Sequence, residues 1–265
     1  MNNQAWRNIV MFSLIAVSCG WIGRAIDLQT GRDATGSLGQ LLWILSPLLS
    51  MMIMRTWMGD GWKDCGFRLH LKGNLLLYGL SILFFPLLAA IVVGIGVCAG
   101  WTNVSLSPTL FAAAFGAALV PSFIKNLCEE LAWRGFLAPK LFALGYNRFL
   151  VHILVGVIWG AWHFPYLFLF TDDMTLMFLL RLMIGVIAMA VLYGEIRLIT
   201  TSVWPAVLMH TMGNACIDTL ILQKFIAVPE TFKYLAMPSP EGLLAMALTG
   251  LAGLWVSRRN VRRPA

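Results

Sequence analysis

The chain has 265 residues, of which 59% are hydrophobic and only 12% are charged. Soluble domains carry roughly twice this share of charged residues, so the composition and a mean hydropathy of +0.79 exclude a water-soluble domain and predict an integral membrane protein. A net charge of +7 would suit nucleic-acid binding, but the basic residues fall in short loops and in the tail at 257–265, as in membrane proteins. We therefore expect a lipid bilayer and no nucleic acid as a partner.

Eight apolar runs along the chain approach the ~20 residues that cross a ~30 Å hydrocarbon core as a helix. Their hydrophobicity is continuous and lacks the alternation that membrane strands need. No repeat or polar linker divides the chain, so we predict a single all-α domain over residues 1–265, a polytopic transmembrane helical bundle of about eight spans. In chain order the runs cover about 8–26, 38–58, 74–97, 108–127, 149–170, 174–193, 202–222 and 242–257.

The five cysteines show no CxxC spacing and lie mostly in apolar runs, so we expect neither a disulfide framework nor a thiolate metal site. In the first run, "LIAVSCG" places Cys19 in a context that resembles a lipoprotein cleavage site. However, Ala16 stands three residues earlier, where a leucine is expected, and the residues after Cys19 stay apolar. We therefore expect the first helix to be retained.

Loop charges predict how these spans are oriented. Arg7 precedes the first span, and basic residues also follow the second, fourth and eighth spans, which places all of them on one side. The segment 98–108 is uncharged and 171–173 is acidic, with Lys224 and Lys233 as exceptions. The positive-inside rule then predicts cytoplasmic termini, and we expect the plasma membrane as the location. The basic residues are Lys63, Arg68, Lys72, Lys140, Arg148, Arg258, Arg259, Arg262 and Arg263.

The stretch "NLCEELAWRGFLAPKL" at 126–141 concentrates charge in an otherwise apolar chain. An ionisable residue at membrane depth costs ~2.5–3.5 kcal/mol on insertion scales, so each of these charges needs a reason. On a helix, Arg134 lies one turn after Glu130 and can neutralise it, whereas Lys125 lies one turn before Glu129. Two interpretations remain open at this point, a charged helix end at the membrane interface and a functional site.

Two further stretches supply polar side chains on other helices. "IWGAWHFPYLF" places His163 in the fifth run, and "WPAVLMHTMGNACID" places His210 and Asn214 one turn apart in the seventh. Each residue alone suits a packing role through hydrogen bonds between helices. Together with the two glutamates they provide a base, an orienting partner and an oxyanion stabiliser for hydrolysis. We therefore expect a catalytic core at about 108–222.

Three motifs in this order resemble the CPBP intramembrane proteases, also called the Abi or CAAX-protease-and-bacteriocin-processing family. The motifs read "EELAWR" at 129–134, "WGAWH" at 159–163 and "HTMGN" at 210–214. The family pattern is EExxxR, then FxxxH or a WxxxH-like variant, then HxxxN, so Trp159 stands where the family often has Phe. The resemblance covers roughly residues 110–220.

The resemblance implies a helical-bundle peptidase that acts on a peptide or a membrane-protein substrate without a cofactor. In such an enzyme Glu129 is the base and His163 its partner in activating a water molecule. His210 and Asn214 stabilise the tetrahedral oxyanion. The supporting residues are Glu130 and Arg134.

Three alternatives remain beside this interpretation. Glu129, His163 and His210 are also a known type of catalytic zinc set, although the chain has no HExxH motif and the family is described as metal-independent. A non-enzymatic membrane immunity or peptide-binding protein would use the same cavity for a partner. A transporter would use the buried acids and histidines as a proton relay.

Overall fold

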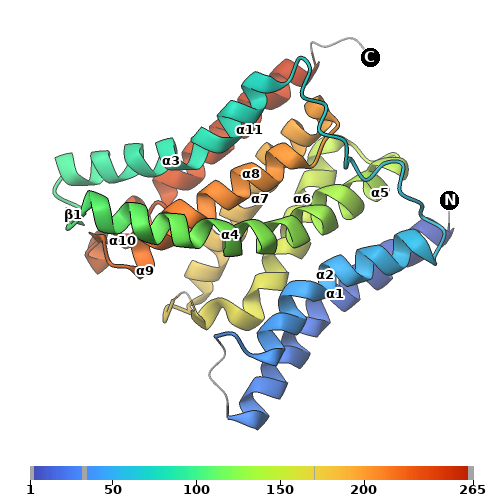
Figure 1. The fold of residues 1–265 in the computed structure, drawn as a ribbon, viewed down its shortest axis with the longest axis horizontal. Coiled ribbons are helices and arrows are strands. Elements are labelled where there is room, and N and C mark those ends of the chain that lie inside the picture. The colour runs from blue at the N-terminus through green and yellow to red at the C-terminus, as the bar shows by residue number, and fades with distance from the viewer. Residues whose placement is uncertain (1–2, 32–34, 170, 262–265) are drawn as a thin grey trace.

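Helices make up almost all of the structure, a computed structural model that describes residues 3–31, 35–169 and 171–261 (Figure 1). The predicted all-α class is confirmed, and every apolar run of the sequence is helical. The long helices are α1 (Asn3–Thr30), α2 (Leu38–Thr56), α3 (Leu75–Cys98), α4 (Pro108–Ala132), α6 (Arg148–His163), α7 (Leu176–Thr200), α8 (Trp204–Gly213) and α11 (Leu243–Val261).

Short elements extend or connect these helices. Helix α4 continues through a π-helical turn, η1 (Trp133–Leu137), into α5 (Ala138–Ala143), and α8 continues through η3 (Asn214–Asp218) into α9 (Thr219–Leu222). A 3₁₀ segment follows α6, and a two-residue antiparallel strand pair joins the segments before α4 and after α9. These elements are η2 (Phe164–Leu169), α10 (Glu230–Ala236), β1 (Asn103–Val104) and β2 (Ile226–Ala227).

Six helical segments of the described chain are long and apolar enough to cross a bilayer, namely α1, α2, α3, α4–α5, α6–η2 and α7. The runs predicted as spans at 202–222 and 242–257 are helical but are not among the six. Their polarity explains this difference, because the first contains His210 with other polar side chains and arginines follow the second. The polytopic bundle is therefore confirmed, with six candidate spans in the described residues instead of about eight.

Local sequence sets where the site-bearing helices begin. Ser107 caps α4 by accepting a hydrogen bond from a backbone N–H of the first turn, and Pro108 occupies the first helical position. Asn147 and Thr175 cap α6 and α7 in the same way. Such caps satisfy backbone N–H groups that have no partner within the helix.

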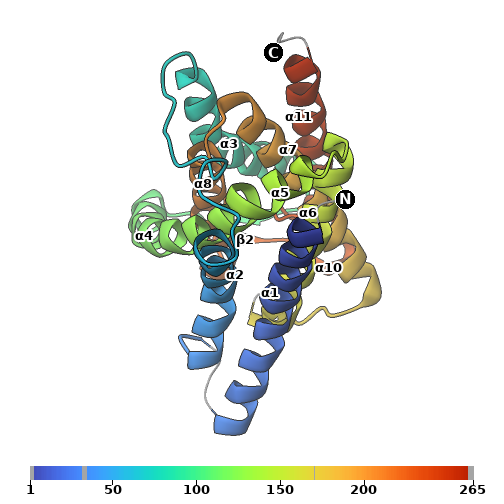
Figure 2. The same ribbon diagram turned by 90° about the vertical axis from the view of Figure 1, so that its right-hand side faces the viewer.

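Helices α1 and α2 lie side by side, and their far end projects beyond the other helices (Figures 1 and 2). The pair is close because two glycines meet: a Cβ added to Gly39 would lie 2.1 Å from the carbonyl oxygen of Gly23. Small residues allow this approach of helix backbones inside membranes. From α2, Trp43 donates to the Trp162 carbonyl at 2.7 Å and accepts from the Trp162 indole at 3.1 Å, which joins the pair to α6.

The start of α1, the end of α11 and residues 57–74 lie toward the upper right of Figure 1. The β1–β2 pair and α10 lie on the opposite side. The described chain thus begins and ends toward the same side of the molecule. That this side is cytoplasmic stays a prediction. Arg262 and Arg263 of the predicted basic tail lie outside the described residues. All five cysteines are free.

Candidate active site

The carboxylate of Glu130 is buried where α4 passes into η1. Arg134 Nη1 donates to Glu130 Oε1 at 2.9 Å, which confirms the pair expected from their spacing. Both side chains are 1% exposed or less. The Arg134 guanidinium also lies over the rings of Trp159 and Tyr193, at 4.3 and 4.9 Å from the ring centroids. Cation–π contacts of this kind stabilise a desolvated guanidinium.

Glu129 is also fully buried but has weaker partners. Trp159 Nε1 donates to its Oε2 at 2.8 Å. Lys125 Nζ lies 3.7 Å from Oε1, so the expected pairing with the lysine one turn earlier is present as a long ion pair. Among the described residues, Oε1 receives no hydrogen bond. One oxygen of this carboxylate is therefore available to a further donor.

His163 lies at the last position of α6, one turn after Trp159. Its Nδ1 is 2.9 Å from the Trp159 carbonyl oxygen, which assigns the proton to Nδ1. In the neutral imidazole the remaining nitrogen, Nε2, is then an acceptor. Trp159 thus holds Glu129 through its side chain and His163 through its backbone. The sequence indicated this tryptophan only as a variant of a motif position.

His210 of α8 bonds to the second glutamate. Its Nδ1 lies 3.0 Å from Glu130 Oε1, the same oxygen that accepts from Arg134. The imidazole packs edge-on against Trp159 and contacts Tyr193, with ring centroids 5.3 and 5.7 Å apart. Glu130 therefore orients His210 in addition to neutralising Arg134, a role that the sequence did not predict.

Asn214 begins the π-helical turn η3, one turn after His210. Its Nδ2 donates to Oδ1 of Asn126, a fully buried residue of α4, at 3.1 Å. This bond joins the two helices that carry the first and third motifs. Asn126 lies three residues before Glu129, about one helical turn away. This spacing could have identified Asn126 as a further site residue from the sequence.

Two of the three motif-bearing helices, α4 and α8, continue into a π-helical turn: η1 begins three residues after Glu130, and η3 begins at Asn214. A π turn is rare, and it often occurs at functional sites because it shifts the helix face by one residue. In η1 the carbonyl of Gly135 accepts a hydrogen bond from Arg55 Nη2 of α2. The chain thus uses a charged donor from another helix to hold the irregular turn next to Arg134.

A cavity of about 840 Å³ adjoins these residues and has the size of a ligand pocket. His163, His210 and Asn214 line it, as do Lys125 and Trp159, the two residues that contact the Glu129 carboxylate. Charged residues of α10 and of the segments beside α7, α9 and α11 line another part of the cavity. These are Asp172, Asp173, Lys224, Glu230, Lys233 and Glu241.

The described residues contain no group of three or more His, Cys, Asp or Glu side chains placed to hold a metal ion. Glu129, His163 and His210 thus contact one tryptophan without forming a compact ligand set. Their arrangement instead leaves a carboxylate oxygen and an imidazole nitrogen available beside a cavity. Those two groups are suited to accept hydrogen bonds from a water molecule.

Residues 110–216 match a family model described as "Type II CAAX prenyl endopeptidase Rce1-like". The match runs from α4 into η3 and contains all three sequence motifs together with Asn126, Trp159 and Tyr193. It covers the region in which the sequence resembles CAAX-type proteases. No curated protein gives a significant match to the chain.

Proposed function

We propose that this chain is an intramembrane endopeptidase, because residues 110–216 match the model of a CAAX-type endopeptidase family, and that it hydrolyses its substrate with a water molecule activated by Glu129 and His163. The observation that carries the proposal is the burial and the hydrogen bonding of the Glu129 carboxylate. This carboxylate is fully buried, and Oε1 receives no hydrogen bond from the described residues. Glu130 Oε2 also lacks a partner there, but Glu130 is already bound to Arg134 at 2.9 Å, whereas the lysine beside Glu129 is 3.7 Å away. A buried acceptor of this kind is costly unless a donor reaches it during function.

Activation of the water follows from the two acceptors. The water donates one hydrogen to Glu129 and the other to His163 Nε2, which directs an oxygen lone pair at the scissile carbonyl carbon. Glu129 takes the proton as the carbon–oxygen bond forms, and later delivers it to the amine of the departing product. A positioned general base contributes typically ~10² to 10⁴-fold to the rate.

The oxyanion that forms in this step needs hydrogen-bond donors. Asn214 has a second amide hydrogen beyond the one that bonds Asn126. His210 uses Nδ1 toward Glu130, so it donates from Nε2 only as an imidazolium, which the Glu130 carboxylate stabilises. A donor aimed at the oxyanion is typically worth ~2.7–4 kcal/mol.

The proposed substrate is a peptide segment of a membrane-associated protein or a free peptide. Peptide backbone is poorly tolerated in lipid unless a protein cavity hydrates or bonds it. The cavity of about 840 Å³ supplies such surroundings, with charged loop residues at one part and the imidazoles at another. A non-enzymatic peptide-binding role would use the same cavity without the proton transfer.

The test is cleavage of a fluorogenic peptide library by purified protein and by the Glu129→Gln variant. Glu129→Gln keeps the side-chain volume and removes the base, so turnover should fall by at least ~10². The His163→Ala/Glu129→Gln double variant should be little worse than either single variant, because groups that act on one water are not additive. Full turnover of folded Glu129→Gln protein would defeat the proposal.

Glu195→Gln is the matched control for this test. Like Glu129, Glu195 is a fully buried glutamate, and it pairs with His152 at 3.2 Å. It lies on α7 and is not among the residues that line the cavity of about 840 Å³ beside His163 and His210, which we call the catalytic cavity. This variant should lose stability but keep the turnover of its folded fraction. Peptide binding without cleavage by the wild type would favour the non-enzymatic role.

A further inference from the structure

A second cavity, of about 830 Å³, is lined by residues of the loop after α2, which Figure 1 shows on the side of the molecule where the described chain begins and ends. It is enclosed by the loop after α2, the η1–α5 segment and the last turns of α7. Its charged lining is mostly positive: Lys63, Arg68, Arg134 and Arg197, with Asp64 as the acidic residue. We call it the basic cavity.

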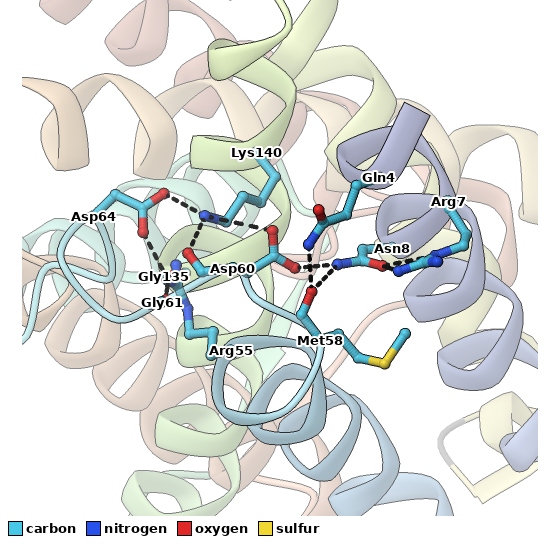
Figure 3. Close-up of polar contacts among 10 residues, drawn as sticks. All are labelled: Gln4, Arg7, Asn8, Arg55, Met58, Asp60, Gly61, Asp64, Gly135 and Lys140. Atoms are coloured by element: carbon cyan, nitrogen blue, oxygen red, sulfur yellow. Dashed lines mark hydrogen bonds and ion pairs between the residues drawn. The ribbon is translucent and has the colours of Figure 1, made fainter. Parts of the chain in front are cut away.

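The one carboxylate of the basic cavity is bound to cations that are not part of its lining. Asp64 Oδ1 accepts from Arg55 at 2.7 Å, and Oδ2 lies 3.0 Å from Lys140 Nζ (Figure 3). Burial would raise the pKa of Asp64, but the hydrogen bonds from these two cations hold it below its ordinary value. Asp64 is therefore ionised, and its charge is largely balanced by Arg55 and Lys140.

The arginines of the basic cavity have hydrogen-bond donors without acceptors. Arg134 is 1% exposed, and its Nη2 has no partner among the described residues. Arg197 donates from Nη2 to the Asp64 carbonyl at 2.9 Å, but its Nε is buried and also has no partner there. Within the described chain, no carboxylate forms an ion pair with Lys63, Arg68 or Arg197. Unpaired buried donors of this kind are rare and indicate a ligand.

The cavity wall includes aromatic side chains suited to a membrane interface. Trp62 and Phe67 both line the cavity, stack with ring centroids 5.7 Å apart, and are 38% and 44% exposed. Exposed Leu69 and Leu71 follow them in the same loop. Aromatic residues among cations are typical of the level at which lipid headgroups lie.

We propose that the basic cavity binds a phosphate group, supplied by the headgroup of an anionic lipid or by free phosphate. A phosphate offers several acceptor oxygens to the unpaired guanidinium donors, and Arg is suited to bind it in a bidentate manner. Lys63 and Arg68, both exposed, add charge around the arginines. The stacked pair Trp62–Phe67 favours a lipid as the source of the phosphate.

The basic cavity and the catalytic cavity are joined by one chain of hydrogen bonds. Arg134 lines the basic cavity and donates to Glu130, and the same Glu130 oxygen bonds His210, which lines the catalytic cavity. A phosphate at Arg134 would share its guanidinium with Glu130 and leave that carboxylate more available to a protonated His210. This consequence rests on the proposed function, whereas the binding of phosphate does not.

The experiment measures binding through thermal unfolding, so that its outcome is independent of turnover. The full chain in maltoside micelles is titrated with phosphatidylglycerol, with phosphatidylcholine at equal mole fraction, and with inorganic phosphate against chloride at equal ionic strength. Ligands that bind the native state raise Tm in proportion to their occupancy. We expect phosphatidylglycerol to raise Tm well above the phosphatidylcholine value. A comparable rise with inorganic phosphate would identify free phosphate as the source.

The variant Lys63→Gln/Arg68→Gln removes two exposed charges of the cavity, and Arg258→Gln/Arg259→Gln removes two exposed charges of the same side outside it. The cavity variant should bind the anion at least about tenfold more weakly, the scale of one lost charge-assisted hydrogen bond. The control should bind as the wild type does. The proposal would be overturned if both variants lost the same anion affinity or if the cavity variant bound as the wild type does. It would also be overturned if no anion raised the Tm of the wild type.

Discussion

Glu129 and Glu130 are adjacent in the chain, but their carboxylates have different surroundings. One oxygen of Glu130 accepts hydrogen bonds from two partners, Arg134 at 2.9 Å and His210 at 3.0 Å. Glu129 has a neutral indole donor at 2.8 Å and a lysine at 3.7 Å. Since a base must accept a proton, the carboxylate without a short ion pair is the better candidate. The helix geometry places the two acids about 100° apart and so permits this division.

The variant Glu130→Gln should therefore lower stability more than it changes the chemistry. It leaves the buried Arg134 guanidinium without a carboxylate, and breaking a buried pair in this way costs about 3–5 kcal/mol. We expect a clear drop in Tm and a partial loss of turnover in the folded fraction, because Glu129 remains. Thermal unfolding and initial rates, measured together, check this. An unchanged Tm with complete loss of turnover would instead assign the base to Glu130.

Metal removal separates the two hydrolytic interpretations of the same side chains. If Glu129 and His163 activate water directly, treatment with a strong chelator should leave turnover nearly unchanged. Elemental analysis of the active protein should then find no stoichiometric zinc. Loss of turnover on chelation, with recovery on adding zinc, would show that Glu129, His163 and His210 act as ligands.

At the scale of elements, the π-helical turn η1 depends on a residue from another helix. Arg55 of α2 donates to the carbonyl of Gly135 in η1 and to Asp64 in the following loop (Figure 3). Lys140 of α5 binds both Asp64 and Asp60. This cluster fixes the loop after α2 against the turn that carries Arg134. The turn is consequently held from outside its own helix.

The variant Arg55→Gln should disturb η1 and the catalytic site beyond it. Each buried acceptor left without a donor costs about 1–3 kcal/mol, so we expect a lower Tm. A displaced Arg134 should reduce kcat with little change in KM, because the cavity lining is untouched. Arg55→Lys should recover part of the loss, and the exposed Arg258→Gln should show none. Equal values of kcat in all of these variants would contradict the positioning role.

The features predicted correctly from the sequence are those that depend on neighbouring residues along one helix. The apolar runs predicted the helices, and the spacing of four residues predicted Glu130–Arg134 and Lys125–Glu129. It did not predict the π turns or the bond between His210 and Glu130, which are 80 residues apart in the chain. Such features depend on how helices pack, and a single sequence carries only the polar residues from which they are made.

At the scale of the whole molecule, the two cavities lie on opposite sides of the Arg134–Glu130–His210 bonds. The rim of the catalytic cavity is tied to the loop between α3 and α4, because Ser105 bonds through its backbone and side chain to residues 224 and 225. Lys224 lines that cavity. The β1–β2 pair extends the connection. We therefore expect the catalytic cavity to be reached from the side that this loop faces.

Loop charges predict that this side faces the outside of the cell, and labelling with a membrane-impermeant thiol reagent tests the prediction. In a cysteine-free background, Ser105→Cys should be modified in intact cells, whereas Lys63→Cys, in the basic cavity, should react only after lysis. The opposite pattern would place the termini outside.

If Ser105→Cys reacts as expected, a membrane-impermeant peptide substrate should be cleaved by intact cells that express the wild type. The Glu129→Gln cells are the control, because they retain the same topology and lack the base. Cleavage only after lysis would mean that the substrate enters from the side of the termini.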